Sequence, residues 1–203
     1  MKKQLVIGLV LLSLAACGPS IKTERVSTAK GDALAAKITD EWLLTDTEMA
    51  VADIIKQIAV SKSWQAYRAR LGRNPKLFVA EVGNQTSEPY FPVGDLNDEL
   101  LTQFSASGDY VLVDAAARDK ILKELTFQND GMVDPAEAKQ IGQMSGADLM
   151  IFGDVRMQPG TLAGKTIKEY TVNLRMTDIA KGVEVLRVRF KNSKYSARSG
   201  FGW

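Results

Sequence analysis

The amino-acid sequence predicts a single α/β domain, a sandwich in which helices flank a mixed sheet of four to five strands. Three observations support this fold class. The composition, 45% hydrophobic and 25% charged, is that of a globular protein. Short apolar segments alternate with amphipathic helical segments, and helical connections favour parallel pairing of the first strands. The Lys181-Gly182 turn between two alternating segments favours a closing antiparallel hairpin.

The chain begins with an export signal. A short basic start precedes an apolar stretch, residues 5–14, which is too short to span a bilayer. This stretch ends in Leu14-Ala15-Ala16-Cys17, which resembles a bacterial lipobox, where cleavage precedes a cysteine that is then acylated. An ordinary signal peptide with an incidental cysteine is the alternative, but this is the only cysteine of the chain. We therefore expect a signal peptide over residues 1–16 and lipidation at Cys17.

Residues 17–39 contain few large apolar groups and are predicted to be a lipid-anchored tether. As a flexible coil this tether has a typical span of about 26 Å, and fully extended it reaches at most roughly 75 Å. Gly18 stands where an aspartate would signal retention in the inner membrane. We therefore expect an outer-membrane protein whose domain faces the periplasm, with the α/β domain at residues 40–191 and a flexible tail at 192–203.

The folded domain starts near Trp42 with helical periodicity. Thr45 and Glu48 have the spacing of a capping box, and the helical stretch runs to Leu71 with a possible break at residues 61–63. The residues predicted to face inward are Met49, Ala52, Ile55, Ile58 and Ala59, followed by Trp64, Tyr67 and Leu71.

The elements that follow are short and well separated. Residues 77–82 form a buried strand, 83–94 a loop, and 95–107 a helix whose inward residues are Leu96, Leu100, Leu101 and Phe104. A second buried strand is predicted at 110–113. Helices are predicted at 118–127 and from Asp134, with Pro135 at its first position. The remaining strands are a buried one at 146–153 and the hairpin strands at 170–176 and 183–190.

Charge is distributed unevenly along the chain. Residues 95–154 hold twelve acidic and four basic side chains, whereas residues 165–198 hold nine basic and three acidic ones. We favour compensation of one segment by the other; an exposed basic patch for anionic lipid headgroups, glycan phosphates or an acidic protein is the alternative. The signal peptide holds two of the 26 basic residues and none of the 24 acidic ones, so the rest is formally neutral. Neutrality and export argue against nucleic-acid binding.

Several kinds of chemistry are excluded or disfavoured. Without histidine and with one cysteine, the chain lacks a histidine-assisted triad, a histidine-ligated zinc site and a thiolate metal cluster. The segment 160–166 resembles a phosphate-binding loop, but three residues separate its glycines where four are needed, and a strand follows it. The adjacent pair Asp98-Glu99 and the pair Asp114 and Asp119 are more typical of solvated helix faces than of an acid/base pair. We expect no catalytic, cofactor, nucleotide or metal site, and no enzyme.

The loop at 83–94 is the candidate partner-binding surface. Asn84 and Thr86 supply hydrogen-bonding groups, and Tyr90 and Phe91 lie between two prolines that limit the entropy lost on docking. Alternatively, the two aromatic residues fold back to cover the edge of the sheet. The basic strand segment from Lys165 onward is the next candidate.

Three segments together carry a family resemblance. They are residues 108–113 (Gly-Asp-Tyr-Val-Leu-Val), 146–153 (Gly-Ala-Asp-Leu-Met-Ile-Phe-Gly) and the closing hairpin at 172–185. With the lipobox, the tether and Asn84-Gln85-Thr86, they resemble the LpoB-type family of outer-membrane lipoproteins that activate penicillin-binding proteins. More distant similarity extends to CsgG-like lipoproteins and the N-terminal domain of TolB. The tether is shorter than the long proline-rich one of the best-known family member, and Leu186 stands where the family often has tryptophan.

The resemblance implies a non-enzymatic regulator that binds a peptidoglycan synthase, a penicillin-binding protein, and raises its activity. A subunit of a CsgG-like secretion or other envelope assembly complex is the alternative, and it requires a ring and a membrane-inserting hairpin, for which residues 158–168 are a weak candidate. An envelope scaffold with another partner is a third. A monomer in solution favours the regulator, and a ring favours the secretion subunit.

Overall fold

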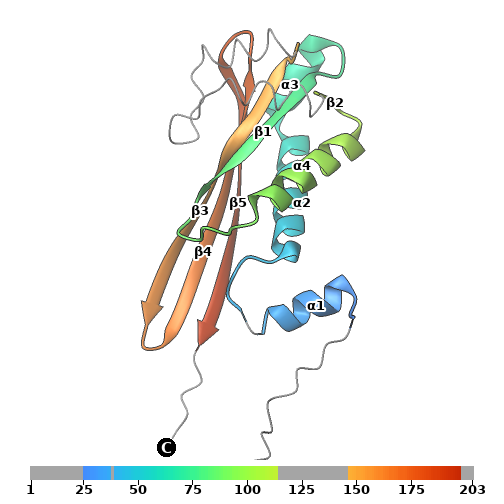
Figure 1. Ribbon diagram of the computed structural model, residues 1–203. Helices are drawn as coiled ribbons and strands as arrows, with labels where there is room; N and C mark the ends of the chain where they lie inside the picture. The colour runs from blue at the N-terminus through green and yellow to red at the C-terminus, as the bar shows by residue number, and fades with distance from the viewer. Residues whose placement is uncertain (1–24, 38, 114–145, 198–203) are drawn as a thin grey trace, which may run out of the picture.

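The computed structural model describes residues 25–37, 39–113 and 146–197, and these form the mixed α/β domain that the sequence predicts (Figure 1). The described helices are α1 (Thr28–Ala35), α2 (Leu44–Val60), α3 (Lys62–Leu71) and α4 (Val93–Ser107). The described strands are β1 (Lys76–Gln85), β2 (Val111–Leu112), β3 (Leu149–Leu162), β4 (Lys165–Asp178) and β5 (Val183–Ala197).

The five strands form one sheet in the order β2-β1-β3-β4-β5. β1 pairs in parallel with β2 and β3, whereas β3, β4 and β5 pair antiparallel, which confirms the predicted mixture. Gly153 of β3 lies so close to β4 that an added Cβ would stand 1.8 Å from the backbone oxygen of Asn173. Glycine is therefore required at this position of β3, because any side chain here would collide with the backbone of β4.

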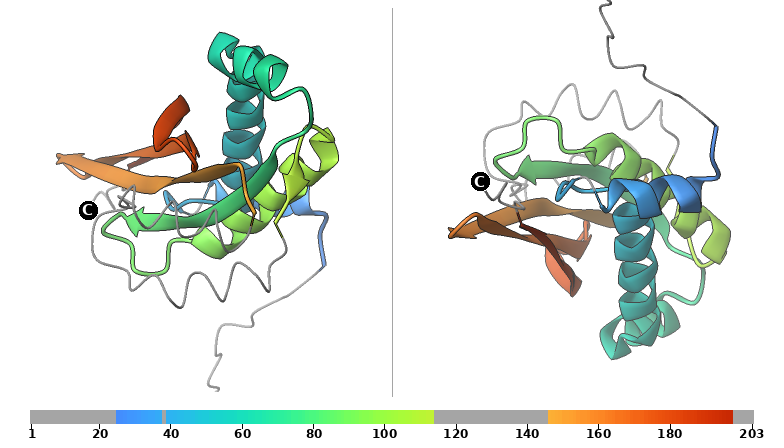
Figure 2. Two further views of the ribbon diagram at one scale, coloured as in Figure 1. Left: turned by 90° about the horizontal axis from the view of Figure 1, so that it is seen from above. Right: turned by 90° about the horizontal axis from the view of Figure 1, so that it is seen from below.

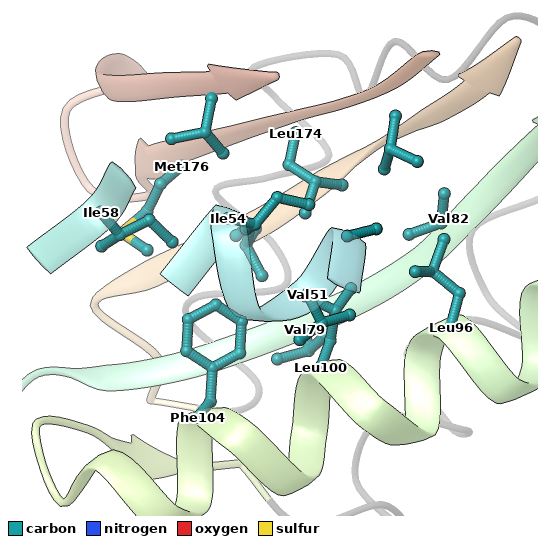
Figure 3. Packing of buried hydrophobic residues seen from close by; sticks show 14 of the residues in the cluster. Val51, Ile54, Ile58, Val79, Val82, Leu96, Leu100, Phe104, Leu174 and Met176 are labelled. Carbon is teal, nitrogen blue, oxygen red and sulfur yellow. The ribbon is translucent and has the colours of Figure 1, made fainter. Parts of the chain in front are cut away.

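The main core lies between the sheet and helices α2 and α4 (Figure 3). Side chains from α2, α4 and the facing side of the strands interdigitate there, among them Ile54, Ile58, Val79, Leu100, Phe104, Leu174 and Met176. The sheet is curled, so β5 also approaches α2 (Figure 2). Because strand side chains alternate between faces, a smaller cluster around Phe78, Met150 and Phe152 lies on the opposite face.

The helical predictions were confirmed in α4 and partly wrong in α2. In α4 the buried residues include Leu96, Leu100 and Phe104, as predicted. In α2, Met49 is exposed, and the helix buries Ala50, Val51 and Ile54 instead. Apolar side chains surround much of this helix, so periodicity alone did not identify the buried face. The predicted break is confirmed at Ser61, whose hydroxyl accepts a hydrogen bond from the Trp64 amide at the start of α3.

The start of α2 differs from the predicted capping box. The Asp46 carboxylate, not that of Glu48, accepts a hydrogen bond from the backbone amide of Leu43 at 2.8 Å. Thr45 instead donates its hydroxyl to Asp32 of α1, which links the two helices. The first turn of α2 therefore also holds α1 against the domain.

Several predicted boundaries need correction. The strand predicted at 110–113 is a two-residue strand at the edge of the described sheet, and Val111 is exposed. The tail predicted from residue 192 is strand as far as Ala197, since residues 192–197 pair with β4. The described part of the predicted tether contains α1. The signal peptide, Cys17, the helices predicted at 118–127 and from Asp134, and Asp114 and Asp119 lie outside the described residues.

Strands β3, β4 and β5 run beyond the ends of α2 and α4 as a projecting arm, defined by residues 157–170 and 191–197 (Figure 1). The hairpin at its tip turns through Ala163 and Gly164, whose φ angles are 50° and 75°. Two consecutive positive φ angles define the two-residue turn that matches the twist of antiparallel strands. The segment 160–166 is therefore a hairpin between two strands. A strand follows it, as predicted from the sequence, and not the helix that follows a phosphate-binding loop.

The outer edge of β5 is partly closed by a side chain of α2. The Gln57 amide donates to the backbone carbonyl of Arg189 at 2.8 Å, and its oxygen accepts from the Arg189 backbone amide at 3.2 Å. One side chain thus occupies both hydrogen-bonding groups of a residue on the last strand of the sheet. Asp53 fixes the Gln57 amide through a 2.6 Å hydrogen bond.

The Gly-Ala-Asp segment before β3 joins two parts of the chain. Asp148 accepts two hydrogen bonds from the Arg73 guanidinium, at 2.7 and 2.8 Å, and one from the Lys76 backbone amide. Burial raises the pKa of the Asp148 carboxyl, but these hydrogen bonds outweigh it and the pKa is lowered. The aspartate therefore stays ionised and fastens the start of β3 to the start of β1.

Within the described residues, none of the helices combines the length and the apolarity needed to cross a bilayer.

Candidate partner-binding surface

The loop between β1 and α4 is folded by two of the predicted site residues. The Asn84 side-chain oxygen accepts hydrogen bonds from the Thr86 amide at 2.9 Å and the Thr86 hydroxyl at 2.7 Å. The Asn84 amide donates to the Glu88 carbonyl, and the Thr86 hydroxyl accepts from the Glu88 amide. The hydrogen-bonding groups of Asn84 and Thr86 are thus used inside the loop, where they set its shape.

The other two predicted site residues point in opposite directions. Tyr90 is 97% exposed, whereas Phe91 is 5% exposed. The Phe91 ring lies 5.2 Å from that of Trp42 and 6.1 Å from that of Tyr170, centroid to centroid. Phe91 therefore folds back into the core, as the alternative interpretation expects, whereas Tyr90 stands in solvent on a fixed loop and its contact with a partner stays a prediction.

Glu88 fastens this loop to β4, a role that no local sequence pattern indicated. Its carboxylate accepts hydrogen bonds from Lys168 at 2.8 Å and from the Tyr170 hydroxyl at 2.9 Å. Burial, and then the hydrogen bond to Glu88, raise the pKa of Tyr170. Burial alone would lower the pKa of Lys168, but its bonds to Glu88 and Asp40 raise it. Both groups therefore keep their protons at neutral pH and donate them to carboxylates.

Two further carboxylates from the N-terminal side hold the arm. Asp40 lies 3.0 Å from the Lys168 ammonium and accepts from the Ser196 hydroxyl at 2.7 Å. Asp46 lies 2.5 Å from the Lys194 ammonium and accepts from the Asn192 amide at 2.6 Å. We call these three carboxylates and their partners the clasp, whose members are Asp40, Asp46, Glu88, Lys168, Tyr170, Asn192, Lys194 and Ser196.

The clasp changes the interpretation of the charge distribution. Residues 165–198 were predicted to be neutralised by the acidic segment 95–154. In the described residues, the lysines of the arm that bind the clasp carboxylates, Lys168 and Lys194, pair with acids at positions 40, 46 and 88. Asp154 is used within its own strand, by Arg156 at 3.0 Å. For these two lysines the partners are acidic, as predicted, but lie outside the segment 95–154, of which residues 114–145 lie outside the described residues.

A second surface lies on the sheet face opposite the main core. It carries five basic side chains from three neighbouring strands, which are Arg156, Arg175, Arg187, Arg189 and Lys191. Arg187 is paired with Glu184 at 2.7 Å, and the Arg175 guanidinium lies 4.6 Å from the ring centroid of Phe152. This face is the basic surface that the sequence offered as the second candidate.

The carboxylates considered as candidate sites can be located among the described residues. No three His, Cys, Asp or Glu side chains among residues 25–37, 39–113 and 146–197 are grouped in a way that could hold a metal ion. Asp98 is exposed on α4 and Glu99 accepts from Gln103 of the same helix, as expected of a solvated helix face. Exposed side chains in this part of the molecule lie at Tyr90, on the basic sheet face and at the tip of the arm.

Comparison with known proteins gives one family. The family model described as peptidoglycan-synthase activator LpoB matches residues 46–187. The LpoB C-terminal domain from Escherichia coli is 14% identical, with a TM-score of 0.50, and the match covers 75% of this chain and 99% of that one. The NMR structure of E. coli LpoB is also 14% identical, with a TM-score of 0.51, over 98% of this chain and 91% of that one. At such identities these two structures support the fold alone, and no curated protein sequence matches the chain.

Proposed function

Because the chain belongs to the LpoB family of peptidoglycan-synthase activators, we propose that it is a lipid-anchored, non-enzymatic regulator of a penicillin-binding protein. The observation that carries the proposal is the family match, which extends over nearly all of α2, over α3, α4 and β1 to β4, and over the start of β5. Of the two main functions expected from the sequence, this match favours the regulator over the secretion subunit.

The exposed ring of Tyr90 is the feature best suited to contact the synthase. Aromatic side chains bury a large area at little entropic cost and dominate many interfaces. Asn84, Thr86 and Glu88 fix the loop by hydrogen bonds, and Phe91 anchors it in the core. The loop therefore loses little freedom when a partner docks on it, so more of the contact energy remains available as affinity.

Activation by binding needs no catalytic group in the regulator. A protein that binds the active conformation of a synthase more tightly than the inactive one shifts the population toward the active state. The size of the shift equals the difference between the two binding free energies. On this mechanism, substitutions on the contact surface change activation and affinity together.

The proposed anchor is an acylated Cys17 in the outer membrane, with the domain in the periplasm. Helix α1 shortens the tether, because eight helical residues rise about 12 Å where eight extended residues would span about 27 Å. Asp32 also ties α1 to Thr45 of α2. The synthase must therefore approach the anchored domain closely, within the reach of the residues before α1.

The proposal is tested by photocrosslinking in intact cells, with the full chain carrying a photoreactive amino acid at position 90. The captured protein should bind fluorescent penicillin, which labels penicillin-binding proteins. Position 60 is the matched control, since Val60 is 68% exposed and is the last residue of α2, outside the loop that carries Tyr90. Capture from position 189 on the basic face, and not from 90, would retain the function and move the surface. Capture of no penicillin-labelled protein from any of the three positions would contradict the function.

The anchor is tested separately. Cys17→Ser should abolish incorporation of labelled fatty acid and release the chain from membranes, because the chain has no other thiol. A serine variant that still carries acyl label and fractionates with membranes would show that the lipobox interpretation is wrong.

A further inference from the structure

The tip of the arm carries an apolar patch on the sheet face that is turned away from the main core. Leu162 is 81% exposed, and Ile167 and Tyr195 are 45% and 60% exposed. Ile167 lies directly opposite Tyr195 in the β4–β5 ladder and opposite Gly160 in the β3–β4 ladder. Because glycine has no side chain, Ile167 is left open on that side. We call Leu162, Ile167 and Tyr195 the tip patch.

The N-terminal segment enters the domain at this same end. Asp40 accepts a hydrogen bond from Ser196, which pairs with Thr166, two residues from the hairpin turn. Figure 1 shows α1 and the tip of the arm at one end of the molecule, and α3 with the turn between β4 and β5 at the other. The segment between α1 and α2 thus contacts the arm close to the hairpin turn, at the same end of the molecule as α1.

The chain between the proposed anchor and the start of α1 is short. Ten residues separate Cys17 from Ser27, the residue that caps α1, and ten residues span at most about 35 Å. An anchored domain therefore keeps the end that carries α1 and the tip within a few tens of ångströms of the lipid surface, roughly the reach of this tether. A contact that is weak by itself becomes populated under these conditions, because tethering makes it intramolecular.

We infer that the tip patch rests on the membrane in which the chain is anchored, with Leu162, Ile167 and Tyr195 in the interfacial layer. This inference rests on the proposed lipid anchor. Tyrosine is enriched at membrane interfaces, where its ring is apolar and its hydroxyl is hydrated. Lys165 lies opposite Leu162 at the turn and is exposed, so its ammonium can reach anionic headgroups.

The size of the patch favours a lipid surface over a second copy of the chain. A stable protein interface buries about 800 Å² on each partner, which is far more than three side chains on a narrow hairpin supply. A bilayer requires no complementary shape, and the anchor supplies most of the binding. Contact at the tip then fixes the orientation of the domain and directs α3 and the β4–β5 turn away from the membrane.

The test uses the full lipidated chain in vesicles of phosphatidylethanolamine and phosphatidylglycerol. Leu162→Cys introduces the only free thiol, since Cys17 is acylated, and this thiol is labelled with an environment-sensitive dye. Val60→Cys is the matched control, an exposed aliphatic position at the opposite end of the molecule. Both substitutions fall on exposed side chains, so neither removes core packing. Lipids with a spin label near the headgroup quench dyes that reach the interface.

The expected result is several-fold stronger quenching at position 162 than at position 60. Equal quenching in a chain that floats with the vesicles overturns the inference and leaves the anchor standing. Dye emission that changes with the amount of protein on each vesicle, but not with the amount of spin-labelled lipid, also overturns the inference. In that case the tip binds a second copy of the chain. If the wild-type chain does not float with the vesicles, the anchor itself is wrong and the inference fails with it.

Discussion

The packed half of the sheet and the arm belong to the same three strands, but different interactions hold them. In the packed half, residues 149–155, 172–178 and 183–190, nearly every inward side chain is apolar and buried beneath α2 and α4. In the arm, Tyr170 is the one buried residue among the described ones, and the other inward positions of β4 and β5 are filled by Thr166, Lys168, Asn192, Lys194 and Ser196.

The two halves of the same strands are therefore stabilised by different kinds of interaction. Apolar burial is non-directional and depends little on salt or pH, so the packed half keeps its structure under most conditions. The clasp depends on charge and on defined hydrogen-bond geometry, and it joins residues between 80 and 156 positions apart. The arm can therefore loosen while the packed half stays folded, and the following experiments test this separation in order of decreasing effect.

The largest effect is expected from Phe104→Ala in the packed half. Phe104 is fully buried and contacts the ring of Tyr110 edge-on at 5.0 Å. Removing a buried phenylalanine ring costs about 3–5 kcal/mol of unfolding free energy, which urea denaturation measures. A loss below about 1 kcal/mol would show that α4 is not part of the core.

A smaller effect is expected from Asp46→Asn, which leaves the partly buried Lys194 without its carboxylate. We expect a loss of about 2 kcal/mol, as for a hydrogen bond to a charged group. Hydrogen exchange should accelerate in residues 191–197 and stay slow in the packed half. Adding Lys194→Met should recover part of the loss, because the unpaired charge is then absent.

The matched control for that pair is Glu184→Gln, which removes the carboxylate from an exposed pair with Arg187. Exposed ion pairs contribute about 0–1 kcal/mol, so this change should alter stability little. Equal losses for Asp46→Asn and Glu184→Gln would mean that the clasp is an ordinary surface pair and that the arm is held in another way.

The next effect concerns pH. The Ser196 hydroxyl, and then Lys168, donate hydrogen bonds to the charged Asp40 carboxylate and lower its pKa. A lowered pKa in the folded state gives stability that is complete above the ordinary aspartate pKa of about 3.9, and that stability is lost as the pH falls through the lowered value.

Asp40→Asn should therefore destabilise the chain at pH 7 by up to about 1 kcal/mol, since the pair is partly screened by solvent. The difference between the two chains should shrink at pH 3. Urea midpoints at both pH values measure it. A difference that is unchanged or larger at pH 3 would contradict the assigned role of Asp40.

The smallest effect on stability is expected from Tyr90→Ala. Because the ring is almost fully exposed, the unfolding free energy should change by no more than about 0.5 kcal/mol. Capture of the synthase should fall nonetheless, as seen by co-purification of penicillin-labelled protein from cells. Unchanged capture would exclude Tyr90 from the contact surface, and a loss of stability would place its ring in the core.

The sequence predicted the packed half better than the arm, for a physical reason. Burial follows local periodicity, and α4 was predicted with its correct inward residues. In α2 the predicted face was partly wrong: Ile58 is buried as predicted, but Met49 and Ile54 are both apolar, and only the surrounding sheet decides which of those two is buried. The clasp could not be predicted at all, since nothing local to Glu88 indicates that it binds Lys168 and Tyr170 eighty residues later.

In the candidate site, too, local features were predicted and contacts between distant residues were not. The exposed loop was predicted from its prolines and aromatic residues, but the opposite fates of Tyr90 and Phe91 depend on Trp42 and Tyr170, which no spacing connects with the loop. Partner binding by Asn84 and Thr86 stays a prediction; in the structure their side chains shape the loop, which the sequence did not indicate.

Gln57 has a consequence for how the chain behaves among many copies of itself. β5 is a long strand at the end of the sheet, and an uncovered edge of this kind can template fibrils and domain-swapped aggregates. By occupying the amide and the carbonyl of Arg189, Gln57 interrupts the row of groups on which such growth would begin. The exposed Lys191 adds repulsion between like strands, so the edge of the sheet as well as its core opposes aggregation.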